Sequence, residues 1–318
     1  MAVLEVKNLS TYYHTKEGQN QALDDLSFEL NKGEMIGLIG ESGCGKSTAG
    51  FSIMRMISYP GEIKKGEVLF FGKDILNLKD KEFRQILWKD IAMIPQSSMN
   101  ALNPSYKIGD QIIEAIMIHY PEISKKEAEK KAKELLKSVG IDEKWHNAYP
   151  HKLSGGMKQR VIIAMALSCE PKVIISDEST TGLDVLIQAQ ILALLKKLQK
   201  ERQLSIIVIS HDLHMVTSIC DKIAIMYAGN LVEIGTTQEI QKDARHPYTK
   251  ALFNSQIGID DLDRVVESID GVVPKLINPE NKCRFYNRCS IKTDKCQKTP
   301  PELRQVSDTH YIACYMEE

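Results

Sequence analysis

Residues 40–48 read GESGCGKST, and the rest of the chain is interpreted around this stretch. It follows the apolar run Met35–Ile39, which predicts a short buried strand, and it leads into a predicted helix that begins near Ser47. The spacing matches G-x-x-x-x-G-K-[ST], a pattern in which glycines let backbone N–H groups surround a phosphate. A helix that follows adds its positive N-terminal end. The stretch therefore predicts a phosphate site at the end of a buried strand.

The residue types in this loop indicate ATP with Mg²⁺ as the ligand. Lys46 is expected to reach the β- and γ-phosphates, and Ser47 is expected to ligate Mg²⁺. We expect Cys44 to be a small side chain that the loop tolerates rather than a redox group. The remaining predicted contacts of the loop with the nucleotide are Gly40, Ser42, Gly43, Cys44, Gly45 and Thr48.

A second site, which is acidic, is predicted at residues 173–178, VIISDE, where an apolar strand ends in two carboxylates. Asp177 at the strand end is expected to hold Mg²⁺, directly or through water. Glu178 lies one residue further and is expected to orient or deprotonate the attacking water. Together with the phosphate loop, this pair predicts nucleotide hydrolysis.

Composition restricts the class of protein. The 318 residues are 43% hydrophobic and 26% charged, which is typical of a globular chain with one large or two medium domains. The net charge of −1 gives no basic field that would favour nucleic acid, so no nucleic-acid partner is expected. The apolar runs are far shorter than the roughly 18–20 residues that span a bilayer, and the N-terminus does not resemble a secretory signal. We therefore expect a cytoplasmic protein that reaches a membrane only by docking to other subunits.

Strand-like and helical stretches alternate along most of the chain. The first 35 residues predict a compact antiparallel sheet, and later apolar runs near residues 91, 173, 206 and 223 predict strands of a parallel sheet. Residues 185–199 carry an apolar helical face between two of these strands. About residues 100–160 no strand pattern occurs, which predicts a helical insertion that includes the charged stretch Lys125–Ser138. The fold class is α/β: a P-loop NTPase core with an antiparallel β subdomain, the helical insertion and a small irregular C-terminal extension.

Residues 153–160, LSGGMKQR, resemble the signature of ABC ATPases, and further matches follow in the order typical of that family. Gln96 is similar to the Q-loop glutamine, Asp184 in STTGLDV to the D-loop aspartate, and His211 in VISHD to the switch histidine. Tyr13 is similar to the aromatic residue that stacks on adenine, with Tyr12 as the alternative. The resemblance covers residues 1 to about 245.

The resemblance implies how these residues act. Gln96 would ligate Mg²⁺ and sense the γ-phosphate, and neutral His211 would contact the γ-phosphate and the attacking water. Ser154, Gly155 and Gly156 offer a hydroxyl and open N–H groups at a helix start, which is a second anion-binding feature in one chain. In this family two subunits pair head to tail, so that each signature closes over the ATP of the other subunit. The partner would be a paralogue or a second copy of this chain.

Two residues depart from the family pattern. Many relatives have DEPTTALD where this chain has DESTTGLD, with Ser179 and Gly182. Neither change removes a charged group, so hydrolysis is still expected. Gly182 is expected to loosen the turn that carries Asp184.

The C-terminal part resembles the extension of peptide-importer ATPases, the dipeptide, oligopeptide and nickel group. The matching stretches include RHPYT at residues 245–249, followed by a helix expected to start at Lys250, and GVVPKL at residues 271–276. These matches divide the chain into an ATPase domain, residues 1–245, and an extension, residues 246–318. The resemblance implies transmembrane permease subunits as partners at the cytoplasmic face of the membrane, and residues 97–107 are our candidate for docking to them.

Four of the seven cysteines crowd the last 40 residues with the spacing C-x5-C-x6-C-x17-C: Cys283, Cys289, Cys296 and Cys314. In a cytosolic chain such a group favours a metal site over disulfides. Four thiolates suit tetrahedral zinc or an iron–sulfur cluster. The loose spacing and the resemblance favour a 4Fe–4S cluster, with Zn²⁺ as the alternative. His310 could replace one ligand, although we expect it to be solvated.

The sequence thus predicts an ATPase subunit that energises an importer of dipeptides and oligopeptides, with nickel or another small solute still open. A soluble ABC ATPase of DNA repair or translation is the alternative, but such proteins usually fuse two ATPase halves or insert long coiled coils, and neither occurs in these 318 residues. A regulatory subunit that binds ATP without turnover is a third hypothesis, which the presence of Glu178 and His211 disfavours.

Overall fold

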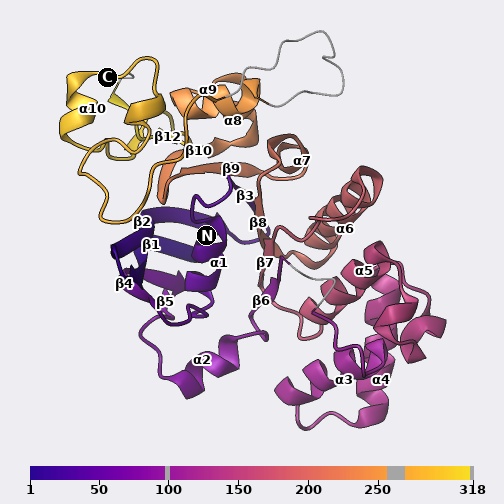
Figure 1. The fold of residues 1–318 in the computed structure, drawn as a ribbon. Coiled ribbons are helices and arrows are strands. Elements are labelled where there is room, and N and C mark those ends of the chain that lie inside the picture. The colour runs from indigo at the N-terminus through magenta and orange to yellow at the C-terminus, as the bar shows by residue number, and fades with distance from the viewer. Residues whose placement is uncertain (97–100, 256–268, 316–318) are drawn as a thin grey trace. The chain divides into compact units, whose positions relative to one another are not determined.

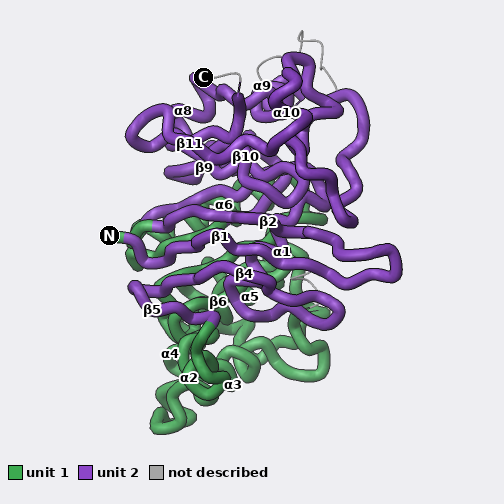
Figure 2. Tube along the Cα trace, turned by 90° about the vertical axis from the view of Figure 1, so that its left-hand side faces the viewer, with its two compact units in different colours: residues 1, 31–33, 77–207 green, residues 2–30, 34–76, 208–318 purple. Residues whose placement is uncertain are grey.

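The computed structural model describes residues 1–96, 101–255 and 269–315 (Figure 1). These residues form two compact units, shown in different colours in Figure 2. Unit 1 contains residues 1, 31–33 and 77–207, and unit 2 contains residues 2–30, 34–76 and 208–318.

Unit 2 contains the predicted antiparallel sheet, with the strand order β2-β1-β4-β5. Its strands are β1 (Ala2–Thr15), β2 (Gly18–Asn31), β4 (Gly61–Phe70) and β5 (Lys73–Asp74). The apolar residues Leu4, Val6 and Leu9, on which the prediction rested, are buried. The antiparallel pairing of β4 with β1 was not predicted, because β4 is rich in Lys, Glu and Gly and has few of the residues favoured in strands.

A second sheet of unit 2 has the order β11-β12-β10-β9-β3-β8. Its central strands are β3 (Met35–Ile39) and β9 (Lys222–Tyr227), which pair in parallel. The helical elements of this unit are α1 (Lys46–Ile53), α7 (Leu213–Thr217), α8 (Thr237–Lys242), α9 (Pro247–Asn254), η4 (Tyr286–Arg288) and α10 (Asp294–Lys298). The helix that we expected to start at Lys250 is α9, and it begins at Pro247 because proline suits the first turn and His246 caps it.

The parallel sheet that the sequence predicts is extended by antiparallel strands in unit 2. Strand β10 (Asn230–Thr236) pairs antiparallel with β9 across the two residues Ala228 and Gly229, because so short a connection cannot make a parallel crossover. Both connecting residues have positive φ angles, 49° and 88°, as two-residue hairpin turns require. The extension then adds β12 (Tyr311–Ile312) and β11 (Arg304–Gln305) beside β10.

Unit 1 contains β6 (Ile91–Ile94) and β7 (Val173–Asp177), which pair in parallel and are fully buried, as expected for such strands. Strand β8 (Ser205–Ser210) is shared, with residues 205–207 in unit 1 and residues 208–210 in unit 2. The helical elements of unit 1 are α2 (Asp80–Ile86), α3 (Ile108–His119), α4 (Lys125–Ser138), η2 (Glu143–Asn147), η3 (Pro150–Lys152), α5 (Gly155–Ala166) and α6 (Val185–Arg202).

The stretch without strand patterns is helical in the structure. Described residues 101–160 contain α3, α4, η2, η3 and the first turns of α5, and no strand. Charged α4 buries one narrow face made of Ala128, Ala132, Leu135 and Leu136. Of the candidate docking loop, residues 97–100 lie outside the described residues, and residues 101–107 precede α3. Among the described helices, none has the length and hydropathy needed to cross a bilayer.

Candidate functional site

The phosphate loop joins β3 to α1, as the sequence predicts, and its glycines are required by geometry. Gly43 and Gly45 have φ angles of 79° and 100°, a region that residues with a Cβ atom rarely adopt. A Cβ atom on Gly45 would collide with the carbonyl oxygen of Ala22, and one on Gly40 would collide with that of Met226. The chain therefore reaches this loop conformation only with glycine at these positions.

Lys46 lies inside the loop and is buried. Its ammonium group donates hydrogen bonds to the carbonyl oxygens of Gly40 (2.7 Å) and Glu41 (3.0 Å). A buried ammonium group held by neutral carbonyls is suited to exchange these partners for the negative oxygens of a phosphate. Cys44 is fully buried, and burial raises the pKa of its thiol, which disfavours the reactive thiolate. Its environment fits the expected passive side chain.

Unit 2 also holds the predicted switch histidine and the predicted adenine-stacking residue. His211 is exposed and follows β8, the strand next to β3 in the sheet order. Tyr13 on β1 packs its ring over Gly61 on β4. Its neighbour Tyr12, the alternative candidate, donates a hydrogen bond from its hydroxyl to Asp24 (3.1 Å). Successive strand residues face opposite sides of a sheet, so only one of the two tyrosines can face a given ligand.

Unit 1 contains two of the predicted catalytic residues, Gln96 and Glu178, and the predicted Mg²⁺ ligand Asp177. Asp177 is buried at the end of β7, and Glu178 follows it with a positive φ angle of 40° that turns the chain away from the strand. The Nε2 atom of Gln96, which lies just beyond β6, donates a 2.6 Å hydrogen bond to the carboxylate of Glu178. Because β6 and β7 pair in parallel, their carboxyl ends meet at one edge of the sheet. The phosphate loop and His211 belong to unit 2, so each unit contains a part of the predicted nucleotide-site residues.

The two departures from the family pattern have local explanations. Ser179 is buried, and its hydroxyl lies 2.7 Å from that of Ser176 in a shared hydrogen bond. Gly182 has a φ angle of 81°, in the region that favours glycine. At this position glycine thus suits the turn that leads to Asp184.

The signature and the predicted D-loop aspartate both cap helices in unit 1. Ser154 is the N-cap of α5 and accepts a hydrogen bond from the N–H of Met157 (3.3 Å). Asp184 is the N-cap of α6 and accepts one from Ile187 (3.0 Å). A Cβ atom on Gly156 would lie 2.8 Å from the Cγ2 atom of Ile187, so this glycine permits α5 to start close to α6. The serine and the aspartate therefore sit at neighbouring helix starts.

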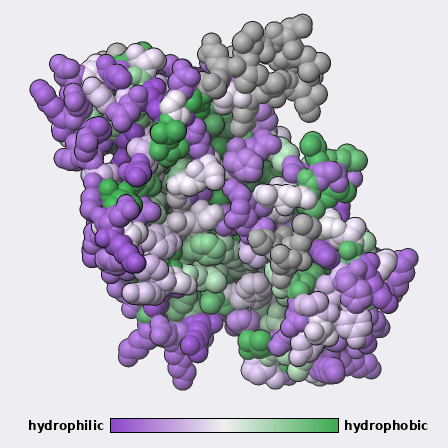
Figure 3. Space-filling view, viewed as in Figure 1, coloured by the Kyte–Doolittle hydropathy of each residue, from purple (hydrophilic) through white to green (hydrophobic). Residues whose placement is uncertain are grey.

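All four C-terminal cysteines line one pocket of unit 2, together with Phe285 and Tyr286. The four cysteines are reduced, and burial raises the pKa of Cys283 to about 11. In the view of Figure 3 the surface of the extension, at the upper left, is mainly hydrophilic. The four cysteines therefore share one pocket in a segment whose surface is mainly hydrophilic in this view.

The four cysteines of the pocket are not arranged as a metal-binding group in this structure. Among the described residues, no group of three or more His, Cys, Asp or Glu side chains is placed to hold a metal ion. A single zinc ion needs its four sulfurs about 2.3 Å from one point. His310 is not solvated, as we had expected, because it is 2% exposed and turned toward Glu233.

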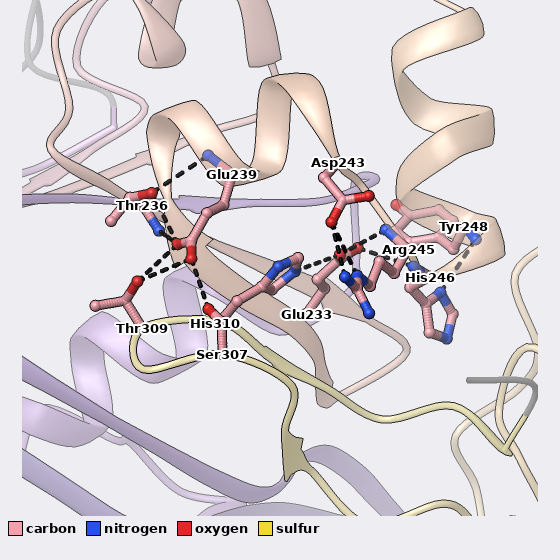
Figure 4. Close-up of polar contacts among 10 residues, drawn as sticks. All are labelled: Glu233, Thr236, Glu239, Asp243, Arg245, His246, Tyr248, Ser307, Thr309 and His310. Carbon is pink, nitrogen blue, oxygen red and sulfur yellow. Dashed lines mark hydrogen bonds and ion pairs between the residues drawn. The ribbon is translucent and has the colours of Figure 1, made fainter. Parts of the chain in front are cut away.

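The extension is fastened to the sheet of unit 2 by two buried or half-buried carboxylates (Figure 4). Glu233 on β10 is fully buried and accepts hydrogen bonds from the backbone N–H groups of Arg245 (2.7 Å) and His246 (3.1 Å) and from Nε2 of His310 (2.8 Å). Glu239 on α8 accepts from the hydroxyls of Ser307 (2.7 Å) and Thr309 (2.8 Å). Burial alone would raise the pKa of Glu239, but these hydroxyls and Thr236 lower it to about 2. Sequence reasoning missed both anchors, although a lone glutamate within the apolar run of β10 was a signal for the first.

The comparisons with known proteins agree with this geometry. A family model described as "ABC transporter" matches residues 23–181, and one described as "Oligopeptide/dipeptide transporter, C-terminal region" matches residues 232–296. The chain is 46% identical to the oligopeptide transport ATP-binding protein OppD of Bacillus subtilis, over 99% of this chain and 88% of that protein. It is 40% identical to the dipeptide transport ATP-binding protein DppD of Escherichia coli, over 99% and 97% of the two chains.

Solved structures extend the likeness to three dimensions. The dimeric bacterial ABC transporter cassette MJ0796 superposes with a TM-score of 0.66 and 29% identity, over 74% of this chain and 98% of that one. The same cassette is also known in a post-hydrolysis state with ADP and phosphate bound, with an equal TM-score of 0.66. The sequence matches to OppD and DppD span nearly the whole chain and include the region after the cassette. This chain belongs to the ATP-binding proteins of the oligopeptide and dipeptide ABC transporter family.

Proposed function

We propose that this chain is the subunit that binds and hydrolyses ATP to energise a membrane importer of dipeptides and oligopeptides. Its relatives are named for oligopeptide and dipeptide transport, and the match to the C-terminal region model supports the same group. The observation that carries the hydrolytic part is the hydrogen bond between Gln96 and Glu178 at the end of β7. It holds a candidate base beside a candidate γ-phosphate sensor. Nickel or another small solute stays the alternative cargo.

The proposed roles follow from the chemistry of each side chain. Lys46 and the loop N–H groups would hold the β- and γ-phosphates, while Ser47, Gln96 and Asp177 would hold Mg²⁺. Bound Mg²⁺ would offset the negative charge that collects on the phosphate oxygens. Glu178 would orient the attacking water and take its proton, and neutral His211 would donate a hydrogen bond to the γ-phosphate. Tyr13 would stack on adenine.

A second ATPase subunit, either a paralogue or a second copy, would complete the site. Ser154, Gly155, Gly156 and Asp184 would then face the nucleotide of the partner. The exposed side chains of Val185 and Leu186, directly after Asp184, support an interface there, because two adjacent apolar residues on a helix start are costly to leave in water. Permease subunits would bind this pair at the cytoplasmic face of the membrane. Residues 1–245 would form the ATPase domain, with its helical part at about residues 100–160, and residues 246–318 the extension.

The test of hydrolysis is the variant Glu178→Gln, which keeps the size of the side chain and removes the base. Loss of a general base lowers turnover by at least about a hundredfold. ATP affinity, measured with a fluorescent ATP analogue, should remain, and a longer-lived dimer should appear by size exclusion when ATP is present. Glu201→Gln on the exposed end of α6 is the matched control. Turnover of the Glu178→Gln variant within twofold of the parent chain would reject the assignment.

We also propose a 4Fe–4S cluster ligated by Cys283, Cys289, Cys296 and Cys314. The support is that all four cysteines line one pocket. Cluster binding needs thiolates, and positive iron would offset the burial that raises the pKa of Cys283 and Cys289.

The cluster is tested by purification without oxygen. About four iron and four sulfide per chain, with a visible absorption band that Cys296→Ser abolishes, would support it. One zinc per chain and no iron would refute it in favour of the alternative metal. Cys169→Ser, at a buried cysteine outside the pocket, is the control that should retain the band.

A further inference from the structure

Glu41, the second residue of the phosphate loop, is held on both its backbone and its side chain. Its N–H donates to the hydroxyl oxygen of Tyr248 on α9 (3.0 Å). Its carbonyl oxygen accepts from the ammonium group of Lys46 (3.0 Å) and from the N–H of Cys44 (3.2 Å). The position of Glu41 therefore fixes one of the two carbonyls that orient Lys46.

The carboxylate of Glu41 is bound by Arg288, which lies 247 residues later in the extension. The two atoms Nη1 and Nη2 of Arg288 donate to the two carboxylate oxygens at 2.7 and 3.1 Å. Such a two-point contact fixes direction as well as distance, which a lysine cannot do. The Arg288 side chain is 5% exposed, so the pair is shielded from water on its arginine side. The contact raises the pKa of Arg288, which stays charged at any working pH.

Arg288 is itself rigidly placed. Its Nε and Nη2 atoms donate to the carbonyl oxygens of Asp270 and Ile269, both at 2.9 Å. Its guanidinium lies 5.7 Å from the ring centroid of Tyr227. Because backbone carbonyls elsewhere in the extension hold its guanidinium, Arg288 provides a fixed point for the carboxylate of Glu41.

An aromatic cluster joins the same fixed point to the body of unit 2. The ring of Tyr227 on β9 lies 4.7 Å from that of Tyr248 and 5.1 Å from that of Phe285, between ring centroids. Phe285 also lines the cysteine pocket, and Arg288 directly precedes Cys289. Both contacts to Glu41 thus come from residues beyond 245 that pack against one cluster.

We infer that Arg288 is a positioning residue of the nucleotide site, through which the C-terminal extension sets the geometry of the phosphate loop and hence its affinity for ATP. It acts through the carboxylate of Glu41 and touches neither substrate nor metal. The inference rests on the proposed binding of ATP at this loop. Loss of the pair frees the loop to sample conformations in which the carbonyl of Glu41 no longer orients Lys46. Nucleotide affinity then falls, while the catalytic residues of unit 1 are unchanged.

The test is a double-mutant cycle with Arg288→Gln and Glu41→Gln. We expect Arg288→Gln to raise the dissociation constant for a fluorescent ATP analogue roughly tenfold, as loss of a charged hydrogen-bond pair implies. KM should rise in parallel and kcat should change less than twofold. In the Glu41→Gln background, Arg288→Gln should change the dissociation constant less than twofold, because the carboxylate that Arg288 binds is already absent. Arg288→Lys keeps the charge without the two-point contact and should give an intermediate dissociation constant.

The matched control is Thr309→Val, which removes another anchor of the extension without touching the loop. It should lower the melting temperature but leave nucleotide affinity within twofold. An unchanged dissociation constant in Arg288→Gln, or an equal increase in both Glu41 backgrounds, would overturn the inference. If Arg288→Gln does not fold, Arg288→Lys and Glu41→Gln decide the same question. A parent chain that binds no ATP would instead refute the proposed function.

Discussion

Glu233 offers the sharpest test of how the extension is held, and the change is Glu233→Gln. In the parent chain its Oε1 atom accepts from the N–H of Arg245 and from Nε2 of His310, and its Oε2 atom accepts from the N–H of His246. A carboxylate can accept all of these bonds, whereas an amide has one oxygen and an NH₂ group. Glutamine can keep the first two bonds, but its NH₂ group must then face the N–H of His246.

The cost follows from these contacts. The N–H of His246 is left buried without an acceptor, which costs about 1–3 kcal/mol. The two remaining bonds lose the carboxylate charge, which removes roughly 0.5–1 kcal/mol from each. We therefore expect Glu233→Gln to lower the free energy of unfolding by about 2–5 kcal/mol at pH 7.

Urea unfolding followed by circular dichroism measures this loss, and limited proteolysis should show faster cleavage beyond residue 245. The comparison variant is Glu239→Gln, whose carboxylate is only half-buried. It accepts from the N–H and hydroxyl of Thr236 and from the hydroxyls of Ser307 and Thr309, and water can serve these partners instead. It should cost about 1 kcal/mol or less. A loss below 1 kcal/mol in Glu233→Gln, or an equal loss in the two variants, would refute the reasoning.

Two further predictions concern the same unit. Burial lowers the pKa of His246 to about 4 in the folded state. Below pH 6.5 the unfolded chain binds a proton at this histidine that the folded chain does not bind. The free energy of unfolding therefore decreases as the pH falls from 6.5 toward 4. Urea unfolding should show that the free energy of unfolding falls by about 2 kcal/mol between pH 7 and pH 5. The variant His246→Asn should not show this fall, and asparagine can still cap α9. An equal fall in the variant would contradict the prediction. Gly45→Ala should weaken nucleotide binding at least about tenfold, because the φ angle of 100° and the carbonyl of Ala22 exclude a Cβ atom. Calorimetric titration with ATP measures this, and near-parental affinity would show that the loop has another conformation.

Local patterns were sufficient for most of the elements and for the loops that carry the predicted nucleotide-site residues. The phosphate loop, the carboxylates after β7 and the helix start at Ser154 each depend on neighbouring residues, because a strand end, a glycine turn and a helix cap are made within a few positions of the chain. For the same reason β3, β7 and α6 were predicted close to their observed bounds. The hairpin of β9 and β10 was missed because its turn, Ala228-Gly229, carries a weak signal.

Tertiary structure alone decided how distant segments meet. No spacing rule relates Glu41 to Arg288, or Glu233 to His310, because a hydrogen bond across 247 or 77 residues depends on how the sheet orders its strands. From the sequence we expected His310 to be in solvent. In the structure the pairing of β12 with β10 brings His310, the residue before β12, to the buried carboxylate of Glu233. The sequence by itself determined the family, the nucleotide loop and the four cysteines. Only the folded chain decided that the cysteine-bearing segment contacts the phosphate loop, since charge pairs between segments are made by packing and leave no periodic pattern along the chain.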